Sequence, residues 1–199
     1  MTYEHWLIFG GVCGVSWFVF IYFWPSMLLS VYKRAILVRG FGDGPIPVNT
    51  LYTEPQKLFA EPLTSQTTSS SNLMTTGVNH DTLPTAGWLD LSKEPQVLHV
   101  PDFSRRYYSV QFTDPFNVNF AYVGTRATGT QAGDYLITGP HWKGQVPSSM
   151  TQISSPNNSV LVLGRVLVYS DSDLSTAYDL SKQIQLRPLS GWLQSNSAR

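Results

Sequence analysis

The sequence has little charge and almost no cysteine. Of its 199 residues, 13% are Asp, Glu, Lys or Arg, whereas a typical soluble domain has roughly 25%. The 13 basic and 13 acidic residues cancel, so no overall field attracts nucleic acid, and we predict no nucleic-acid partner. The single cysteine, Cys13, excludes an internal disulfide and a cysteine-based zinc site. Such low charge favours a chain that covers surface against a membrane or other proteins.

Charge is completely absent from one segment near the N-terminus. The 19 residues Trp6–Trp24 contain no Asp, Glu, Lys, Arg or His. As a helix they would extend roughly 28 Å, close to the ~30 Å hydrocarbon core of a bilayer. Trp6 and Trp24 stand at the two ends, where aromatic side chains prefer the membrane–water interface. We therefore predict a single transmembrane helix as an anchor at residues 1–24.

Two other interpretations of this segment are a cleaved export signal and a buried helix of a soluble domain. An export signal normally begins with positive residues, whereas Glu4 and His5 precede this run. The run is also longer than the apolar core of a signal, which has about 7–15 residues. The retained anchor is therefore the favoured interpretation.

The charges that flank the predicted anchor indicate its orientation. Lys33, Arg34 and Arg39 follow it, and positive flanks stay in the cytoplasm. We predict that the N-terminus lies outside and the rest of the chain lies in the cytoplasm. The alternative is a periplasmic domain, if these basic residues belong to a folded helix.

The predicted anchor carries residue types that favour contact with other helices. Gly10 and Gly14 have the spacing of small residues at helix–helix interfaces. The aromatic side chains could touch lipid tails, a quinone or a pigment, and no other cofactor is predicted. A lone tryptophan in the C-terminal tail suggests a further docking point. The predicted membrane or partner contacts are Trp6, Phe9, Gly10, Gly14, Trp17, Phe20, Trp24 and Trp192.

From Trp88 onward, short runs of β-branched and aromatic residues alternate with turn residues. Many short strands predict an antiparallel sandwich or a partly open barrel, so the fold class is mainly β with flanking helices. The run Ser159–Tyr169 is apolar on both faces, which predicts a central strand. The other predicted strands are Val97–Val100, Tyr107–Phe112, Val118–Val123, Tyr135–Thr138 and Thr151–Ser154.

Helical patterns flank the predicted strands. Pro25 begins an apolar run with helical spacing, which predicts a second helix or a kinked continuation of the anchor. Asp171 or Ser172 is placed to cap a last helix, and Leu51–Phe59 is predicted to hold a short one. The predicted organisation is an anchor at 1–24, a β-rich domain at 25–190 with helices at 25–39 and 174–184, and a tail at 191–199.

Three long stretches of the sequence resemble a known bacterial family, domain of unknown function 1254. They are GVNHDTLPTAGWLDLSKEPQVLHVPD (77–102), RYYSVQFTDPFNVNFAYVGTRATGTQAGDYLITGPHWKG (106–144) and SPNNSVLVLGRVLVYSDSDL (155–174). The resemblance is collinear from about Tyr22 to Ser190. It implies a bacterial protein with a β-rich fold and no established activity, so the membrane that the predicted anchor spans would be the bacterial inner membrane.

The sequence departs from this family in two ways. Members usually continue into a second β-rich domain, of unknown function 1214, and this chain is expected to lack it. Many members carry export signals, which implies a periplasmic domain, whereas this chain has an aromatic anchor.

Two groups of polar residues are candidate ligand sites. Asn79, His80 and Asp81 combine a histidine with a carboxylate, although no nucleophile motif accompanies them and a tight turn also explains them. Arg106, Arg126 and Arg165, whose equivalents the resemblance implies recur in the family, could form an anion site. Buried ion pairs explain these arginines as well, and Asp114 or Asp134 are the expected partners. The histidines lack the spacing of metal ligands, so no metal is predicted.

We therefore predict a non-catalytic, single-pass accessory subunit that stabilises a larger membrane complex, such as a bioenergetic or photosynthetic one. Its partners would be other membrane subunits and the lipid bilayer. The alternative is a membrane-tethered enzyme or small-molecule binding protein with a polar pocket near Asn79 and Asp81.

Overall fold

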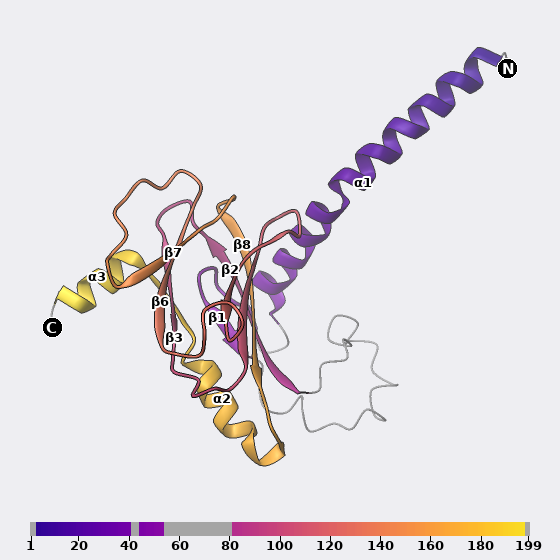
Figure 1. Ribbon diagram of the computed structural model, residues 1–199. Helices are drawn as coiled ribbons and strands as arrows, with labels where there is room; N and C mark the ends of the chain where they lie inside the picture. Colours follow the sequence, from indigo (N-terminus) through magenta and orange to yellow (C-terminus); the bar gives the residue numbers. More distant parts are fainter. Residues whose placement is uncertain (1–2, 41–43, 54–80, 198–199) are drawn as a thin grey trace.

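The computed structural model describes residues 3–40, 44–53 and 81–197 (Figure 1). A long N-terminal helix projects from a sandwich of two β-sheets. The prediction of a mainly β fold with flanking helices and a long apolar helix in front is confirmed.

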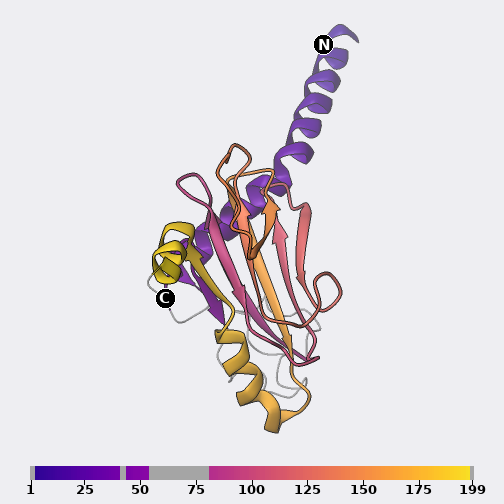
Figure 2. The same cartoon turned by 60° about the vertical axis from the view of Figure 1, so that its left-hand side comes forward.

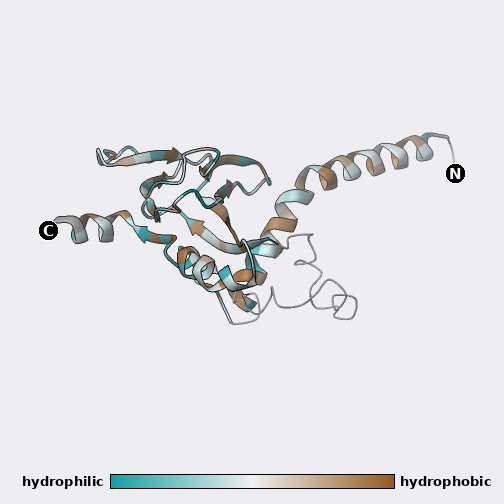
Figure 3. Ribbon diagram, turned by 60° about the horizontal axis from the view of Figure 1, so that its bottom comes forward, coloured by the Kyte–Doolittle hydropathy of each residue, from teal (hydrophilic) through white to brown (hydrophobic). Residues whose placement is uncertain are grey.

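Helix α1 (Tyr3–Arg39) is continuous over 37 residues. Pro25 lies inside it, so the predicted anchor helix and the predicted helix at 25–39 form one element. Gly40 adopts a φ of 62° and donates its N–H to the carbonyl of Ile36 at 2.9 Å, which ends the helix. Residues 3–24 are exposed along their whole length, whereas Leu29 and Ile36 are buried. Figure 3 shows hydrophobic residues along most of the exposed part and hydrophilic residues at its N-terminal end.

The first sheet, sheet A, has five antiparallel strands in the order β1-β2-β8-β4-β5. The strand β8 lies at its centre, as its continuous apolar run predicts. At Leu51–Thr53 the predicted short helix is wrong, because these residues form β1; the rest of that predicted helix lies outside the described residues. The bounds are β1 Leu51–Thr53, β2 Thr82–Asp90, β8 Ser159–Leu167, β4 Tyr108–Thr113 and β5 Asn119–Gly124.

The second sheet, sheet B, has four strands in the order β7-β6-β3-β9. Its β6–β7 pair is parallel, so sheet B is mixed, whereas the predicted sandwich was antiparallel. The long loop between β6 and β7 allows the chain to return and run in the same direction. The bounds are β7 Met150–Ser154, β6 Gly133–Thr138, β3 Gln96–Val100 and β9 Gln185–Pro188.

The main hydrophobic core lies between the two sheets. Alternate residues of each strand point inward, as the period of two in a β-strand requires. Leu83, Val110 and Val162 of sheet A meet Leu98 and Ile137 of sheet B, and all five are at most 1% exposed. This packing makes the sandwich one rigid support for α1.

After β8, the strand of sheet A that comes last in the sequence, the chain forms a short 3-10 helix, η3 (Asp171–Asp173), and two short α-helices (Figure 2). Helix α2 (Leu174–Lys182) lies within the helix predicted at 174–184, and its Ala177 is fully buried against the main core. Helix α3 (Leu189–Ser197) occupies most of the segment predicted as a tail. Strand β9 joins these two helices and pairs with β3.

Candidate membrane and partner site on the N-terminal helix

The exposed part of α1 has the properties of a membrane-spanning segment. Among the described residues, α1 is the helix that is long and apolar enough to cross a membrane. No residue in its most apolar stretch is buried against the sandwich, whereas the core helix of a soluble protein is mostly buried. By length and composition, this segment is a membrane anchor or an export signal.

Three aromatic side chains form a continuous row along α1, which we call the aromatic ladder. The ring centroids of Trp17 and Phe20 lie 5.9 Å apart, and those of Phe20 and Trp24 lie 5.0 Å apart. All three side chains are exposed in this chain. Nearer the N-terminus, the rings of Trp6 and Phe9 meet edge to face at 6.3 Å. These contacts preorder an aromatic surface that lipid or another helix can cover.

The predicted glycine contact points are open. A Cβ atom added at Gly10 or Gly14 would meet nothing within 4 Å. The two residues are four positions apart, so they lie on one side of the helix. Another helix could therefore approach the backbone closely at this point.

The aromatic ladder faces away from the chain's own domain. Leu29 and Ile36 mark the side of α1 that is buried on the sandwich. At about 100° per residue, Trp17, Phe20 and Trp24 point to the opposite side of the helix. A partner that covers the ladder would consequently not collide with sheet A.

A polar and aromatic joint holds the second part of α1 on sheet A. Trp88 of β2 is 2% exposed, and its indole N–H donates to the Ser159 hydroxyl at 2.7 Å. Lys33 of α1 donates to the same hydroxyl at 3.0 Å, and its Nζ lies 5.3 Å from the centroid of the Trp88 ring. Leu29 and Leu161 pack in the same cluster as Trp88. We call Leu29, Lys33, Trp88, Ser159 and Leu161 the helix–sheet joint.

At the other end of sheet A, Arg106 forms a bidentate ion pair with Asp173. The two guanidinium nitrogens donate to the two carboxylate oxygens at 2.5 and 2.7 Å. Arg106 also donates to the Leu167 carbonyl at 2.7 Å and lies over the Tyr169 ring. A buried ion pair was predicted for this arginine, but the expected partners were wrong.

The same carboxylate corrects the predicted helix cap. Neither Asp171 nor Ser172 is the N-cap of α2; Asp173 is, and its side chain makes no capping hydrogen bond. Its carboxylate accepts from Arg106 and from the Tyr169 N–H instead. The hydrogen bond with Arg106 lowers the pKa of Asp173 from its ordinary 3.8 to about 2. The pair therefore ties the end of β8 to the start of α2.

Replacing this carboxylate with an amide tests the role of the pair. Asp173→Asn is expected to lower the free energy of unfolding at neutral pH by about 1–2 kcal/mol. Because the folded pKa is depressed, the wild-type contribution is present above pH 3.8 and is lost as the pH falls through about 2. Urea unfolding of the full chain in detergent should show a weaker acid dependence for the variant.

Asp179→Asn is the matched control, since Asp179 pairs with Lys182 on the surface. It should change stability by less than about 0.5 kcal/mol. Equal losses in the free energy of unfolding in the two variants would show that the Arg106–Asp173 pair stabilises the fold no more than a surface ion pair does.

The other two candidate arginines remain exposed. Arg126 lies in the turn after β5, with its guanidinium carbon 5.8 Å from the centroid of the Tyr107 ring. Arg165 lies on β8, opposite Pro84 and Ser109 in the register. The anion site predicted from these three residues is thus divided between a buried ion pair and two exposed side chains.

The second candidate group is described only in part. Asn79 and His80 lie outside the described residues. Asp81 is exposed, and its carbonyl accepts the Val168 N–H at 2.7 Å. This places Asp81 at the same end of sheet A as Leu167 and Arg106. Across residues 3–40, 44–53 and 81–197, no three His, Cys, Asp or Glu side chains converge as metal ligands.

The aspartates expected to pair with the arginines have other partners. Asp114 accepts the N–H groups of Phe116 and Val118 at 2.8 and 2.9 Å and shapes the β4–β5 turn. Asp134 contacts His99 Nδ1 at 2.7 Å and accepts the Trp192 indole N–H at 3.3 Å.

Trp192, a predicted partner contact, packs on its own chain. Its ring joins the small cluster of Val97, Leu136 and Met150 on sheet B. The side chain is half-buried there. Only its remaining exposed edge is available to a partner.

The helix–sheet joint and the role of Asp173 could not be predicted from local sequence patterns. Lys33 and Ser159 are 126 positions apart, and no local pattern links them. For Asp173 a local signal existed, because several acidic and hydroxyl residues precede α2. The bond of Asp173 to Arg106 depends on the tertiary fold, which the local pattern does not reveal.

The solved structures that are similar to this chain include two bacterial proteins. The crystal structure of the VPA0106 protein from Vibrio parahaemolyticus matches with a TM-score of 0.64 and 25% identity, covering 88% of this chain and 38% of that one. An uncharacterised protein from Burkholderia cenocepacia matches with a TM-score of 0.39 and 12% identity, covering 60% of this chain and 31% of that one. The chain thus spans well under half the length of either protein.

No curated protein matches the sequence. The model of the family described as a protein of unknown function, DUF1254, matches residues 61–188. This range includes both sheets apart from β1, and it leaves α1 outside. It is more than half of the chain, so the chain belongs to the DUF1254 family.

Proposed function

We propose that this chain is a non-catalytic accessory subunit of a larger membrane complex. Helix α1 anchors it in the bacterial inner membrane, and the sandwich packs beside the extramembrane face of the complex. The observation that carries this proposal is the exposed, uncharged stretch Trp6–Trp24, whose aromatic ladder faces away from the chain's own domain.

The composition of α1 supports docking against other helices. In lipid, helices associate through close packing, which small residues allow. Gly10 and Gly14 offer such a surface, and aromatic pairs add about 0.5–1.5 kcal/mol each. Lipid tails, a quinone or a pigment held by the partner would meet the same aromatic ladder.

The charges near the end of the apolar stretch support the proposed orientation in the membrane. Arg34 and Arg39 are exposed, and Lys33 belongs to the helix–sheet joint. All three belong to the folded helix α1, which is the condition for the alternative of a periplasmic domain. Arg34 and Arg39 nevertheless stay exposed on the domain side of the apolar stretch, so we place the N-terminus outside and the domain in the cytoplasm.

The alternative of a tethered enzyme or small-molecule binding protein has less support. Arg106, which an anion pocket would need, already binds Asp173 through both terminal nitrogens. Arg126, Arg165 and Asp81 are exposed. They stay predicted ligand residues, for which a binding measurement is the test.

Two phenylalanines on different sides of α1 test the docking surface. Phe20 belongs to the aromatic ladder, whereas Phe18 points to the side that faces sheet A. Phe20→Ala is expected to reduce the amount of other membrane subunits that co-purify with the chain in mild detergent by several-fold. Phe18→Ala should leave that amount unchanged, since it removes the same apolar area elsewhere. Equal recovery with both variants would contradict the proposed surface.

A further inference from the structure

The β4–β5 turn of sheet A exposes two large apolar side chains. Phe116 is 50% exposed and Val118 is 57% exposed. Both lie between Thr113 and Asn119, which end the neighbouring strands. A turn at the tip of a soluble hairpin normally carries polar residues, so this pair calls for a covering surface.

The turn is held in one shape. Asp114 is 7% exposed, and one of its oxygens accepts the N–H groups of both Phe116 and Val118. Its backbone N–H donates to the Val118 carbonyl at 2.9 Å, and its carbonyl accepts the Asn117 N–H at 3.1 Å. Asn117 adopts a φ of 64°, which Asn tolerates better than most residues. The apolar side chains are therefore presented outward by an ordered turn.

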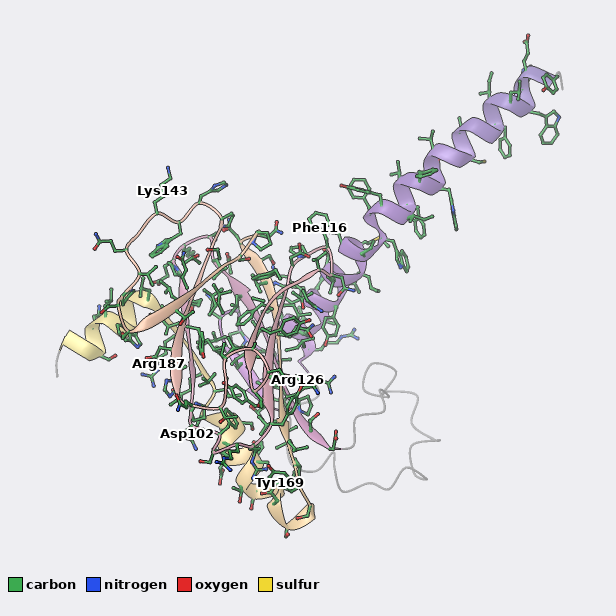
Figure 4. All side chains as sticks on the ribbon, in the orientation of Figure 1. Asp102, Phe116, Arg126, Lys143, Tyr169 and Arg187 are labelled. Atoms are coloured by element: carbon green, nitrogen blue, oxygen red, sulfur yellow. The ribbon has the colours of Figure 1, made fainter. Side chains whose placement is uncertain are left out.

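The position of the turn suggests what covers it. Helix α1 is exposed up to Trp24 and becomes partly buried at Pro25, so no spacer separates the apolar stretch from the sandwich. Figure 4 shows Phe116 at the end of the sandwich from which α1 projects, while Asp102 and Tyr169 lie toward the opposite end. A bilayer crossed by Trp6–Trp24 would have its surface next to this end.

We infer that the β4–β5 turn is a second membrane contact, in which Phe116 and Val118 insert among the lipid headgroups beside α1. This inference rests on the proposed anchoring of α1. Apolar side chains bind at the interface in proportion to the apolar area that they bury there. Two points of attachment, the helix and the turn, fix how the domain is oriented on the membrane.

Single-cysteine variants of the full chain test this contact. The native Cys13 lies within the apolar stretch of α1 and serves as the label site for the anchor. In a Cys13→Ala background, Phe116→Cys places a label on the turn. Ala127→Cys places one on the exposed turn after β5, next to Arg126, which Figure 4 shows away from Phe116. Each is labelled with an environment-sensitive fluorophore and reconstituted alone in phosphatidylcholine vesicles.

The expected result separates the three positions. Nitroxides on the lipid acyl chains should quench the label at position 13. Nitroxides on the headgroups should quench the label at position 116, whose emission should be blue-shifted. The label at 127 should be quenched by aqueous iodide alone.

Failure of the inference and failure of the anchor have different signatures. If lipid nitroxides quench the label at position 13 but the label at position 116 behaves like the label at position 127, the anchor stands and the turn contact is refuted. If the label at position 116 is protected from iodide in native membranes but not in lipid vesicles, the lipid contact is also refuted, and a protein covers the turn instead. If 13 itself is quenched by iodide, the anchor and the turn contact both fail.

Discussion

Trp88→Ala is expected to lower the free energy of unfolding by about 3–5 kcal/mol, the cost of removing a large buried aromatic side chain. Trp88 is 2% exposed and lies between α1 and sheet A. Its loss would remove the donor to Ser159 and the ring beneath Lys33, so the helix would lose part of the joint that holds it on sheet A. Urea unfolding of the full chain in mild detergent, followed by near-ultraviolet circular dichroism, measures the change.

Neighbouring leucines provide the control for this joint. Leu29 is 9% exposed on the sheet side of α1, whereas Leu28 is 50% exposed. Leu29→Ala should cost about 2 kcal/mol, and Leu28→Ala should cost less than about 0.5 kcal/mol. If Trp88→Ala cost under about 1 kcal/mol, or if the two leucine variants were equal, α1 would not be held as we describe.

A reporter fused after Arg199 is expected to be active only if it functions in the cytoplasm. Arg34 and Arg39 are exposed just after the apolar stretch. Moving a positive charge outward against the membrane potential costs roughly 2.3 kcal/mol per 100 mV. A periplasm-only reporter at the same position should therefore be inactive, and its activity would contradict the proposed orientation.

Charge reversal gives this experiment its control. Arg34→Glu combined with Arg39→Glu should shift part of the population to the opposite orientation, because it removes the nearby positive flank. Lys182→Glu combined with Arg187→Glu reverses the same number of positive charges far from the apolar stretch, and it should not change the orientation. Activity of a periplasm-only reporter in both variants and in the wild type would mean that these charges do not set the orientation.

Most of the architecture could be predicted from local sequence patterns. The run Ser159–Tyr169 is apolar on both faces, and β8 lies at the centre of sheet A, with Val162 in the main core on one face and Leu161 in the helix–sheet joint on the other. The strand β2 was missed because Pro84 and Gly87 interrupt its pattern. Pro84 pairs with Arg165 of β8 on one side of β2, and on the other side it lies beyond Thr53–Thr85, the last described pair with β1. The structure accepts the proline there because no described strand pairs with it on the β1 side. Gly87 is needed because a Cβ atom there would lie 2.3 Å from the Thr50 carbonyl oxygen.

The parts of the candidate site that depend on composition could be predicted from the sequence. The parts that depend on long-range contacts could not. The exposed apolar stretch of α1 follows from the absence of charge between Trp6 and Trp24. The partner of Arg106 cannot be predicted from the sequence, because Asp114 and Asp173 look equally suitable there. The main-chain N–H groups of the β4–β5 turn occupy Asp114, which leaves Asp173 for the arginine.

The central claim is that this chain works as a subunit of a larger membrane complex. The most direct measurement is to extract the wild-type chain from its native membrane in mild detergent and determine the mass and protein content of the particle. Our account predicts a particle that contains other membrane subunits in fixed proportion to this chain. Recovery of the chain alone, as a monodisperse protein–detergent particle, would contradict it.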